Sequence, residues 1–159
     1  MNYIIRKSTI ADNQLILDFI KELAVYEKLA DNVVATLENI NKTLFADHPK
    51  AEALILEVEN QPAGFAVFFH NYSTFLCKHG IYIEDIFVKE AYRGHGYGKA
   101  FLKHICRLAK ERDCGRVEWW CLDWNKPSID FYVGLGAEPM SDWTVYRLNK
   151  EQIERMVSC

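Results

Sequence analysis

The sequence predicts a mixed α/β domain, in which a central sheet with antiparallel and parallel strands has helices packed on both faces. Two observations predict this class. Short β-prone apolar runs alternate with stretches whose apolar residues recur at helical spacing, and turn or capping residues separate them. The chain has 159 residues, the usual length of one domain, so we expect a single domain over residues 1–159.

The chain is expected to begin with a strand and two helices. Residues 3–7 alternate between apolar and polar side chains, as in a strand. Thr9 and Asp12 have the spacing of a capping pair at the start of a helix that ends near Tyr26. Thr36 is placed to cap a second, shorter helix.

A hairpin and a third long strand are expected next. Residues 53–58 and 64–69 are apolar, β-prone runs joined across the turn-forming residues 60–62, which predicts an antiparallel hairpin. We expect a loop over residues 71–80. The buried strand at residues 81–88 carries two adjacent carboxylates, which the two-residue period of a strand sends to opposite faces.

The rest of the chain alternates between helices and strands. Its expected elements are an amphipathic helix at residues 98–112, a strand at 116–122, a helix started by Asn125 and Pro127 and ended by Gly136, a strand at 145–148 and a helix at 150–156. The predicted order is therefore β-α-α-β-β-β-α-β-α-β.

Composition excludes several classes of protein. With 50% hydrophobic and 13% aromatic residues, the chain is too rich in core residues for disorder, and charges interrupt every apolar run too soon for a membrane span. A net charge of −3 argues against nucleic-acid binding. Basic residues do gather at 99–112. They are interpreted either as a solvated helix face or as a group that attracts an anionic cofactor. The sequence shows no secretory leader, so we expect a cytoplasmic protein. The cysteines show no CxxC spacing, and we expect them to be reduced and to serve mostly as packing residues.

A glycine-rich loop precedes the predicted helix at 98–112. Its sequence is Arg93-Gly94-His95-Gly96-Tyr97-Gly98, followed by Lys99. Alternate glycines leave backbone N–H groups open and direct them, with the helix dipole, at an anion. The spacing fits neither a Walker loop, which also needs a hydroxyl residue after the lysine, nor a dinucleotide fingerprint. A tight turn into the helix remains the alternative.

A second motif closes one strand and opens the next helix. It reads Asp123-Trp124-Asn125-Lys126-Pro127-Ser128-Ile129-Asp130-Phe131-Tyr132. Together with the glycine loop, this stretch resembles the acetyl-CoA core of the GNAT superfamily of N-acetyltransferases. Tyr26-Glu27, the run from Tyr82 to Val88 and the run from Trp124 to Tyr132 further resemble the diamine (spermidine/spermine) acetyltransferase branch and its thialysine-acetylating relatives.

The resemblance implies a GNAT fold and a binding site for acetyl-CoA as co-substrate, with no metal. Ile86, Phe87 and Val88 would pair with the pantetheine arm, and residues 93–99 would hold the pyrophosphate. The far side of the arm would be lined by Asn125, Pro127, Ser128 and Tyr132.

Acetyl transfer to an amine requires a neutral nucleophile, a stabilised oxyanion and a proton for the departing thiolate. Glu84 is the leading candidate for the base, and the resemblance gives Tyr132 the role of general acid. Aromatic and acidic side chains would form the acceptor cleft and suit a cationic amine. They are Tyr26, Glu27, Glu84, Asp85, Glu118, Trp119 and Trp120. A purely structural role for the carboxylates stays open.

The acceptor is not determined by the sequence. Thr144 stands where the diamine enzymes carry an acid, and the Trp119-Trp120 pair replaces smaller residues, so a short amine or a lysine-like side chain is as consistent as a long polyamine. A protein-lysine or amino-terminal acetyltransferase and a non-catalytic acetyl-CoA sensor are the alternatives. The histidines show neither the spacing of a cysteine-based catalytic site nor that of a metal site. The resemblance also implies a homodimer.

Overall fold

The computed structural model describes residues 2–158. The chain forms two compact units, one ending at Trp120 and the other beginning at Cys121. The first unit contains the sheet, and the second contains two helices with an irregular segment between them.

The sheet of the first unit has five strands in the order β1-β2-β3-β4-β5. Strands β1 to β4 pair antiparallel with their neighbours, whereas β4 and β5 are parallel. The strands are β1 (Tyr3–Lys7), β2 (Glu52–Val58), β3 (Gln61–Ser73), β4 (Lys78–Val88) and β5 (Val117–Trp119). Glu59 and Asn60 connect β2 to β3 with φ angles of 49° and 62°, which suits a tight hairpin turn.

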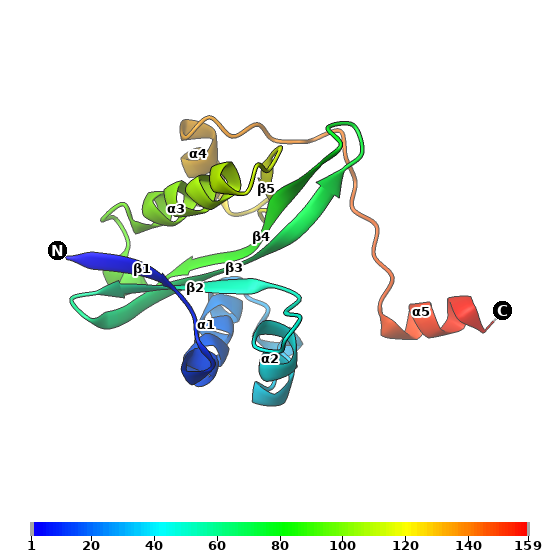
Figure 1. Ribbon diagram of the computed structural model, residues 1–159, viewed down its shortest axis with the longest axis horizontal. Helices are drawn as coiled ribbons and strands as arrows, with labels where there is room; N and C mark the ends of the chain where they lie inside the picture. Colours follow the sequence, from blue (N-terminus) through cyan, green and yellow to red (C-terminus); the bar gives the residue numbers. More distant parts are fainter. Residues whose placement is uncertain (1, 159) are drawn as a thin grey trace. The chain divides into compact units, whose positions relative to one another are not determined.

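Helices cover both faces of this sheet (Figure 1). Helices α1 (Asn13–Tyr26) and α2 (Leu37–Leu44) lie on one face, and α3 (Tyr97–Glu111) lies on the other. Three short 3-10 turns complete the unit: η1 (Ile10–Asp12), η2 (Ala30–Asn32) and η3 (Glu90–Tyr92).

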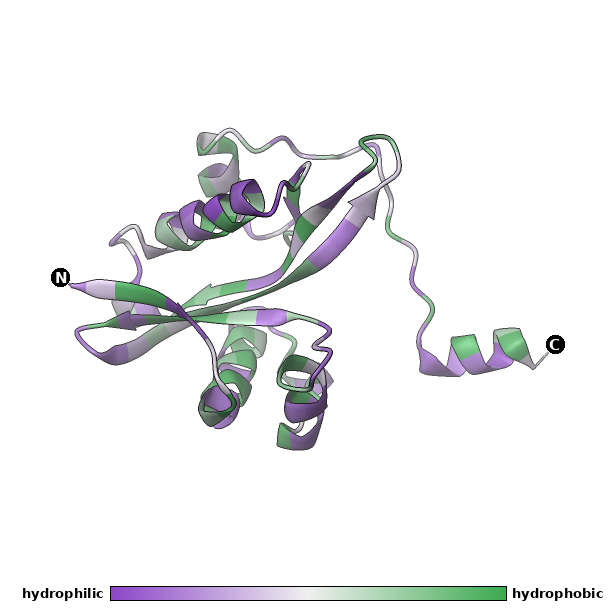
Figure 2. Cartoon of the chain, in the orientation of Figure 1, coloured by the Kyte–Doolittle hydropathy of each residue, from purple (hydrophilic) through white to green (hydrophobic). Residues whose placement is uncertain are grey.

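Each face has its own apolar layer. On the α1 side, the Phe19 and Phe65 rings stack with centroids 5.3 Å apart, and Phe87 meets both edge-on. Much of α1 is hydrophobic (Figure 2), as burial against the sheet requires. On the α3 side, Phe101 and Ile105 are fully buried. Buried side chains therefore anchor the sheet to the helices on both of its faces.

Polar contacts fix the entry into α1. The Asp12 carboxylate accepts a hydrogen bond from the backbone N–H of Thr9 at 2.7 Å and forms a paired contact with the Arg6 guanidinium at 2.8 Å. This arrangement lowers the pKa of Asp12 to about 2, chiefly through the Arg6 hydrogen bond. Thr36 caps α2 by accepting from the N–H of Asn39. The predicted cap at Thr36 is confirmed, whereas the Thr9–Asp12 capping box forms at the η1 turn immediately before α1.

The second unit contains α4 (Lys126–Gly134) and α5 (Lys150–Val157). Pro127 stands in the first turn of α4, and Gly136 follows the helix with a φ of 89°, as predicted. Asn125 is the residue before α4, but its side chain accepts no capping hydrogen bond. At α5, Asn149 and Gln152 form a reciprocal capping box.

Several predictions about local structure are wrong. The loop expected over residues 71–80 is mostly strand, because β3 continues to Ser73 and β4 begins at Lys78. The strand expected at 116–122 is reduced to β5. Residues 145–148 are not a strand, since no described segment pairs with them and Val145, Tyr146 and Leu148 are exposed.

The cysteines also differ from the expectation of packing residues. All four that the structure describes are free thiols, but Cys77 and Cys106 are exposed, and only Cys114 and Cys121 are partly buried. The fifth, Cys159, lies outside the described residues. Between residues 2 and 158, no helix is both long and apolar enough to cross a membrane.

Candidate active site

A β-bulge interrupts β4 at the two adjacent carboxylates. Asp85 pairs with Val67 of β3, whereas the next β3 residue, Phe68, pairs with Ile83, so Glu84 is the extra residue. Side chains alternate along β3, and Asp85 and Ile83 therefore face opposite sides of the sheet. Val67 packs on the α1 core. Asp85 consequently lies on the α1 side, and the simple alternation predicted for this strand is broken at Glu84.

Beyond the bulge, one edge of β4 has no strand beside it. Strand β5 pairs with Ile81, Tyr82 and Ile83 and then ends. The stretch from Ile86 to Val88 pairs only with β3, so its other backbone edge is left without a strand partner among residues 2–158. Free backbone N–H and C=O groups on such an edge can pair with an extended ligand.

The glycine loop leads directly from this edge into α3. Gly94 and Gly96 have φ angles of 78° and 82°, which glycine adopts without strain, and Gly96 is the residue before α3. A methyl group built on either glycine would meet no atom within 4 Å. The loop is thus exposed and open at the positive end of a helix, the environment that an anion requires.

Side chains of the loop divide between solvent and core. Arg93, His95 and Lys99 are exposed, whereas Tyr97 is buried against the ring of Tyr3, with centroids 5.4 Å apart. Gly98 already belongs to the first turn of α3. Tyr97 therefore packs as a core residue and anchors the start of α3.

Arg93 joins the loop to the helix predicted to face the acceptor. Its guanidinium carbon lies 4.5 Å from the centroid of the Tyr26 ring, at the end of α1, and 5.6 Å from the Phe87 ring. Its Nε donates a hydrogen bond to the Val88 carbonyl at 2.9 Å. The two predicted regions, the phosphate loop and the start of the acceptor cleft, therefore meet at this side chain.

Among the predicted site residues of this unit, Asp85 has the pKa that departs most from its ordinary value. Its pKa is raised to about 7, first by burial and then by the negative charges of Glu84 and Glu27. Burial also raises the pKa of Glu27, the residue that follows α1. A carboxylate with a pKa near neutral can exchange a proton at working pH. Glu84 itself is exposed.

The remaining acceptor candidates lie where β5 meets β4. Glu118 pairs with Tyr82, and the Tyr82 ring meets Trp120 edge-on at 5.8 Å between centroids. Tyr82 pairs with Phe69, two residues from Val67, so these side chains share the face of Asp85. Burial, followed by the charges of Glu84 and Glu118, raises the pKa of Tyr82.

Two predicted acceptor residues are less suited to the role. Trp119 pairs with Ile83, which places its side chain on the α3 face, away from Asp85. Glu118 is on the right face, but it accepts from Asn71 at 2.7 Å and forms an ion pair with Arg116 at 2.8 Å. Its charge is already compensated, so it offers less attraction to a cation than Asp85 and Glu27 do.

The other predicted residues belong to the second unit. Asn125 is buried, and its carbonyl accepts hydrogen bonds from the N–H groups of Ser128 and Ile129 at 3.1 and 3.0 Å. Tyr132 is half-buried in α4, with its ring 5.3 Å from that of Phe131. Asn125 thus stands immediately before α4 and Tyr132 lies within it, so the predicted strand-to-helix motif does open a helix.

The chain belongs to the GNAT acetyltransferase family, because the model of the "Acetyltransferase (GNAT) family" matches residues 19–137. This match includes every predicted site residue. The protein is therefore an enzyme of the class that transfers acetyl groups to amines.

Proteins named as amine acetyltransferases, or as similar to one, match nearly the whole chain. A bovine (Bos taurus) thialysine N-epsilon-acetyltransferase is 32% identical, with 96% of this chain and 95% of the relative covered. An L-ornithine N5-acetyltransferase from Arabidopsis thaliana is 31% identical, with coverage of 94% and 86%. A human spermidine/spermine N(1)-acetyltransferase-like protein is 32% identical over 94% of this chain but only 23% of its own length.

Solved structures confirm the fold. An integron cassette protein from the mobile metagenome of V. cholerae superposes with a TM-score of 0.82, at 21% identity, over 100% of this chain and 99% of the other. A ribosomal-protein-alanine N-acetyltransferase from Brucella melitensis superposes with a TM-score of 0.70, at 20% identity, over 93% of this chain and 99% of the other. The predicted fold class is thus confirmed.

Proposed function

We propose that this enzyme transfers the acetyl group of acetyl-CoA directly to the primary amine of a small cationic acceptor. Acetyl-CoA supplies an activated thioester in this reaction. The glycine loop suits its pyrophosphate, because Gly94 and Gly96 are open and exposed at the start of α3. The edge of β4 from Ile86 to Val88, which has no strand partner among residues 2–158, suits its amide-containing arm, although the Val88 carbonyl already accepts from Arg93. Asn125, Pro127 and Ser128 are assigned to the same arm by resemblance.

The raised pKa of Asp85, together with the neighbouring Glu27, carries the acceptor proposal. An alkyl ammonium has a pKa of about 10 and must lose a proton before it can attack a thioester. Asp85, whose own pKa is about 7, is suited to take that proton directly or through water. This assignment shifts the role of base from Glu84, the leading candidate from sequence, to its neighbour.

The other groups complete the chemistry. The charges of Glu27 and Glu84 attract the cationic acceptor, and the aromatic rings of Tyr26 and Trp120 offer it cation–π contacts. Backbone N–H groups at the free edge of β4 donate to the carbonyl oxygen as negative charge develops there. The Tyr132 hydroxyl donates the proton that the departing sulfur requires, a role assigned by the family resemblance.

Relatives suggest which amines to test. Proteins similar to this chain are named for ornithine and thialysine, and both compounds carry a primary amine on a short side chain. We therefore propose a short, lysine-like acceptor in preference to a long polyamine. The replacement of an acid by Thr144 in this chain supports the same choice.

An amine panel tests the proposal. The full chain is assayed with acetyl-CoA and ornithine, thialysine, lysine, putrescine, spermidine and an amino-terminal peptide, and products are identified by mass spectrometry. We expect kcat/KM to be highest for ornithine or thialysine, and Asp85→Asn to lower it by at least about 100-fold. Asp47→Asn, at an exposed position outside the site, is the matched control. Preference for the peptide would overturn the acceptor proposal, and no turnover with any amine would favour a sensor.

We also propose that the enzyme works as a cytoplasmic homodimer. Trp143 and Tyr146 are 75% and 91% exposed, which is unusual for large aromatic side chains and suits burial against a second copy. Light scattering at micromolar concentration is expected to give twice the mass of one chain. The mass of a single chain would contradict this part of the proposal.

A further inference from the structure

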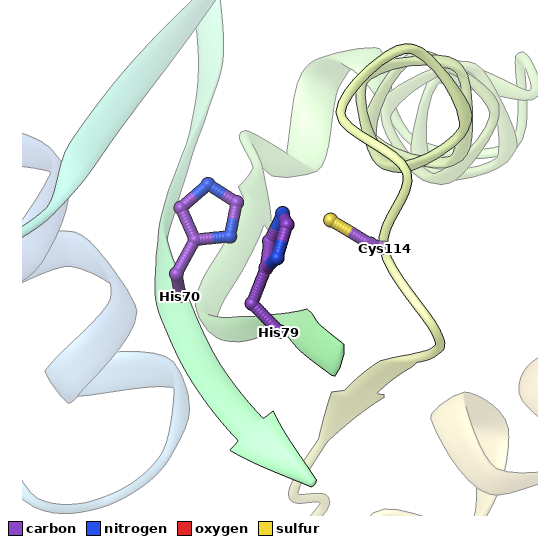
Figure 3. Close-up of side chains that lie close together, drawn as sticks. All are labelled: His70, His79 and Cys114. Atoms are coloured by element: carbon purple, nitrogen blue, oxygen red, sulfur yellow. The ribbon is translucent and has the colours of Figure 1, made fainter. Parts of the chain in front are cut away.

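Two histidines and a cysteine meet on the face of the sheet opposite Asp85. They are His70 of β3, His79 of β4 and Cys114, which follows α3 (Figure 3). One possible ligand atom of each, a ring nitrogen or the sulfur, lies within 4.8 Å of the others. None of the three belongs to the proposed acetyl-transfer machinery.

Backbone pairing brings these residues together. His79 pairs with Tyr72, so His70, two residues earlier on β3, is its diagonal neighbour on the same face. The N–H of Gly115 donates to the His79 carbonyl at 2.9 Å, which fixes Cys114 beside β4. The sequence separations resemble no metal-binding motif, because strand pairing and not local spacing creates the cluster.

Each imidazole has a backbone carbonyl partner, as metal-binding histidines often do. Nδ1 of His70 lies 2.9 Å from the Gly80 carbonyl, and Nε2 of His79 lies 2.9 Å from the Arg112 carbonyl. A carbonyl can only accept a hydrogen bond, so each ring donates one N–H and keeps a lone pair on its other nitrogen. A backbone partner of this kind fixes the tautomer and the ring orientation of a ligating histidine.

The charges around the cluster are largely balanced. Arg112 donates to Nε2 of His70 at 3.0 Å, but its guanidinium also forms a paired contact with Glu52 at 2.5 and 3.0 Å. Lys78 is likewise paired with Asp113 at 2.7 Å. A cation binding here displaces the Arg112 contact with His70, while Glu52 still compensates the guanidinium.

We propose that His70, His79 and Cys114 bind a divalent zinc ion, with water as the fourth ligand. Two imidazole nitrogens and one thiolate are ligands that zinc prefers, in a number that leaves one tetrahedral position open. Zinc would join the β3–β4 pair to the segment after α3 and so stabilise the sheet from the side opposite the carboxylates. Binding converts the Cys114 thiol to a thiolate and releases its proton to solvent.

Zinc and cobalt titrations of the full chain test the site. We expect one zinc ion per chain in competition with a chromogenic chelator, and a sulfur-to-cobalt charge-transfer band when cobalt replaces zinc. Cys114→Ser and His70→Gln should each weaken zinc binding by at least about tenfold. Cys106→Ser and His48→Ala, at exposed positions outside the cluster, should leave it unchanged. Equal binding by wild type and Cys114→Ser would overturn the proposal.

A second measurement needs no variant. Zinc should protect Cys114 from maleimide alkylation, followed by peptide mass spectrometry, while Cys77 and Cys106 continue to react. If Cys114 is alkylated at the same rate with and without zinc, the proposed zinc site is contradicted. This result does not depend on whether the substituted variants fold, because only the wild type is used.

Discussion

The guanidinium carbon of Arg93 lies 4.5 Å from the centroid of the Tyr26 ring, and this contact joins the glycine loop to the end of α1. If Arg93 binds the pyrophosphate, its loss removes a charge-assisted contact of about 1.5–3 kcal/mol. We expect Arg93→Ala to raise the KM for acetyl-CoA by at least about tenfold, in steady-state kinetics. Arg107→Ala, which removes an exposed arginine from α3, should leave the KM unchanged. An equal effect of the two substitutions would remove Arg93 from the binding site.

The glycine loop allows strain to be separated from ligand binding. Gly96 and Gly136 have φ angles of 82° and 89°, and neither has an atom within 4 Å of an added methyl group. Alanine at either position should therefore lower the free energy of unfolding by a similar amount, about 1–2 kcal/mol. Only Gly96→Ala should also raise the KM for acetyl-CoA, because Gly136 lies outside the loop. Denaturant unfolding and kinetics of both variants check this, and an unchanged KM in Gly96→Ala would contradict an open anion cradle.

Asp85 should lower the stability of the enzyme at alkaline pH. Its folded pKa of about 7 exceeds the value of 3.8 for an unperturbed carboxyl, so folding favours its protonated form. The stability that this preference provides is full below about pH 4 and is lost as pH rises towards 7. We expect Asp85→Asn to raise the free energy of unfolding by about 2 kcal/mol at pH 8, after allowance for the partial solvent exposure of Asp85, and by little at pH 4. Urea unfolding at both pH values is the measurement, and a gain of equal size at both would show that the pKa is not raised.

Tyr132 is expected to act mainly in the transition state. Removal of the hydroxyl in Tyr132→Phe should lower kcat by about 100-fold or more and change the KM for acetyl-CoA little. Tyr72→Phe, at a residue that is 58% exposed and has no proposed role in the site or the dimer, is the control. Unchanged kcat in Tyr132→Phe would exclude the residue from proton transfer.

The sequence predicted the fold well where periodicity and capping agree. Strand β1, helices α1 to α5 and the β2–β3 hairpin were predicted because each has an alternating or helical pattern with a clear boundary. The strand expected at 145–148 failed because a short apolar run becomes a strand only if another strand pairs with it. The loop expected at 71–80 failed because its polar residues lie on a two-stranded extension of β3 and β4.

The candidate site was predicted in its residue types but not in its geometry. The adjacent carboxylates were visible, but the bulge at Glu84 that places Asp85 beside the α1 core depends on the register of β3. Similarly, the end of β5 after Trp119 leaves the edge of β4 free, and no sequence pattern indicates where strands part. The diagonal placement of His70 and His79 on two adjacent strands was missed for the same reason.

The pH dependence of kcat/KM for the best amine tests the central claim most directly. If Asp85 takes the proton from the acceptor, the rate of the wild type should fall as pH decreases below about 7, and Asp85→Asn should lack this acidic limb. The acceptor ammonium, with a pKa of about 10, should change kcat/KM a second time at higher pH, and this change should be the same in the wild type and in Asp85→Asn. A wild-type profile without the limb near pH 7, or an identical limb in Asp85→Asn, would contradict the proposed mechanism.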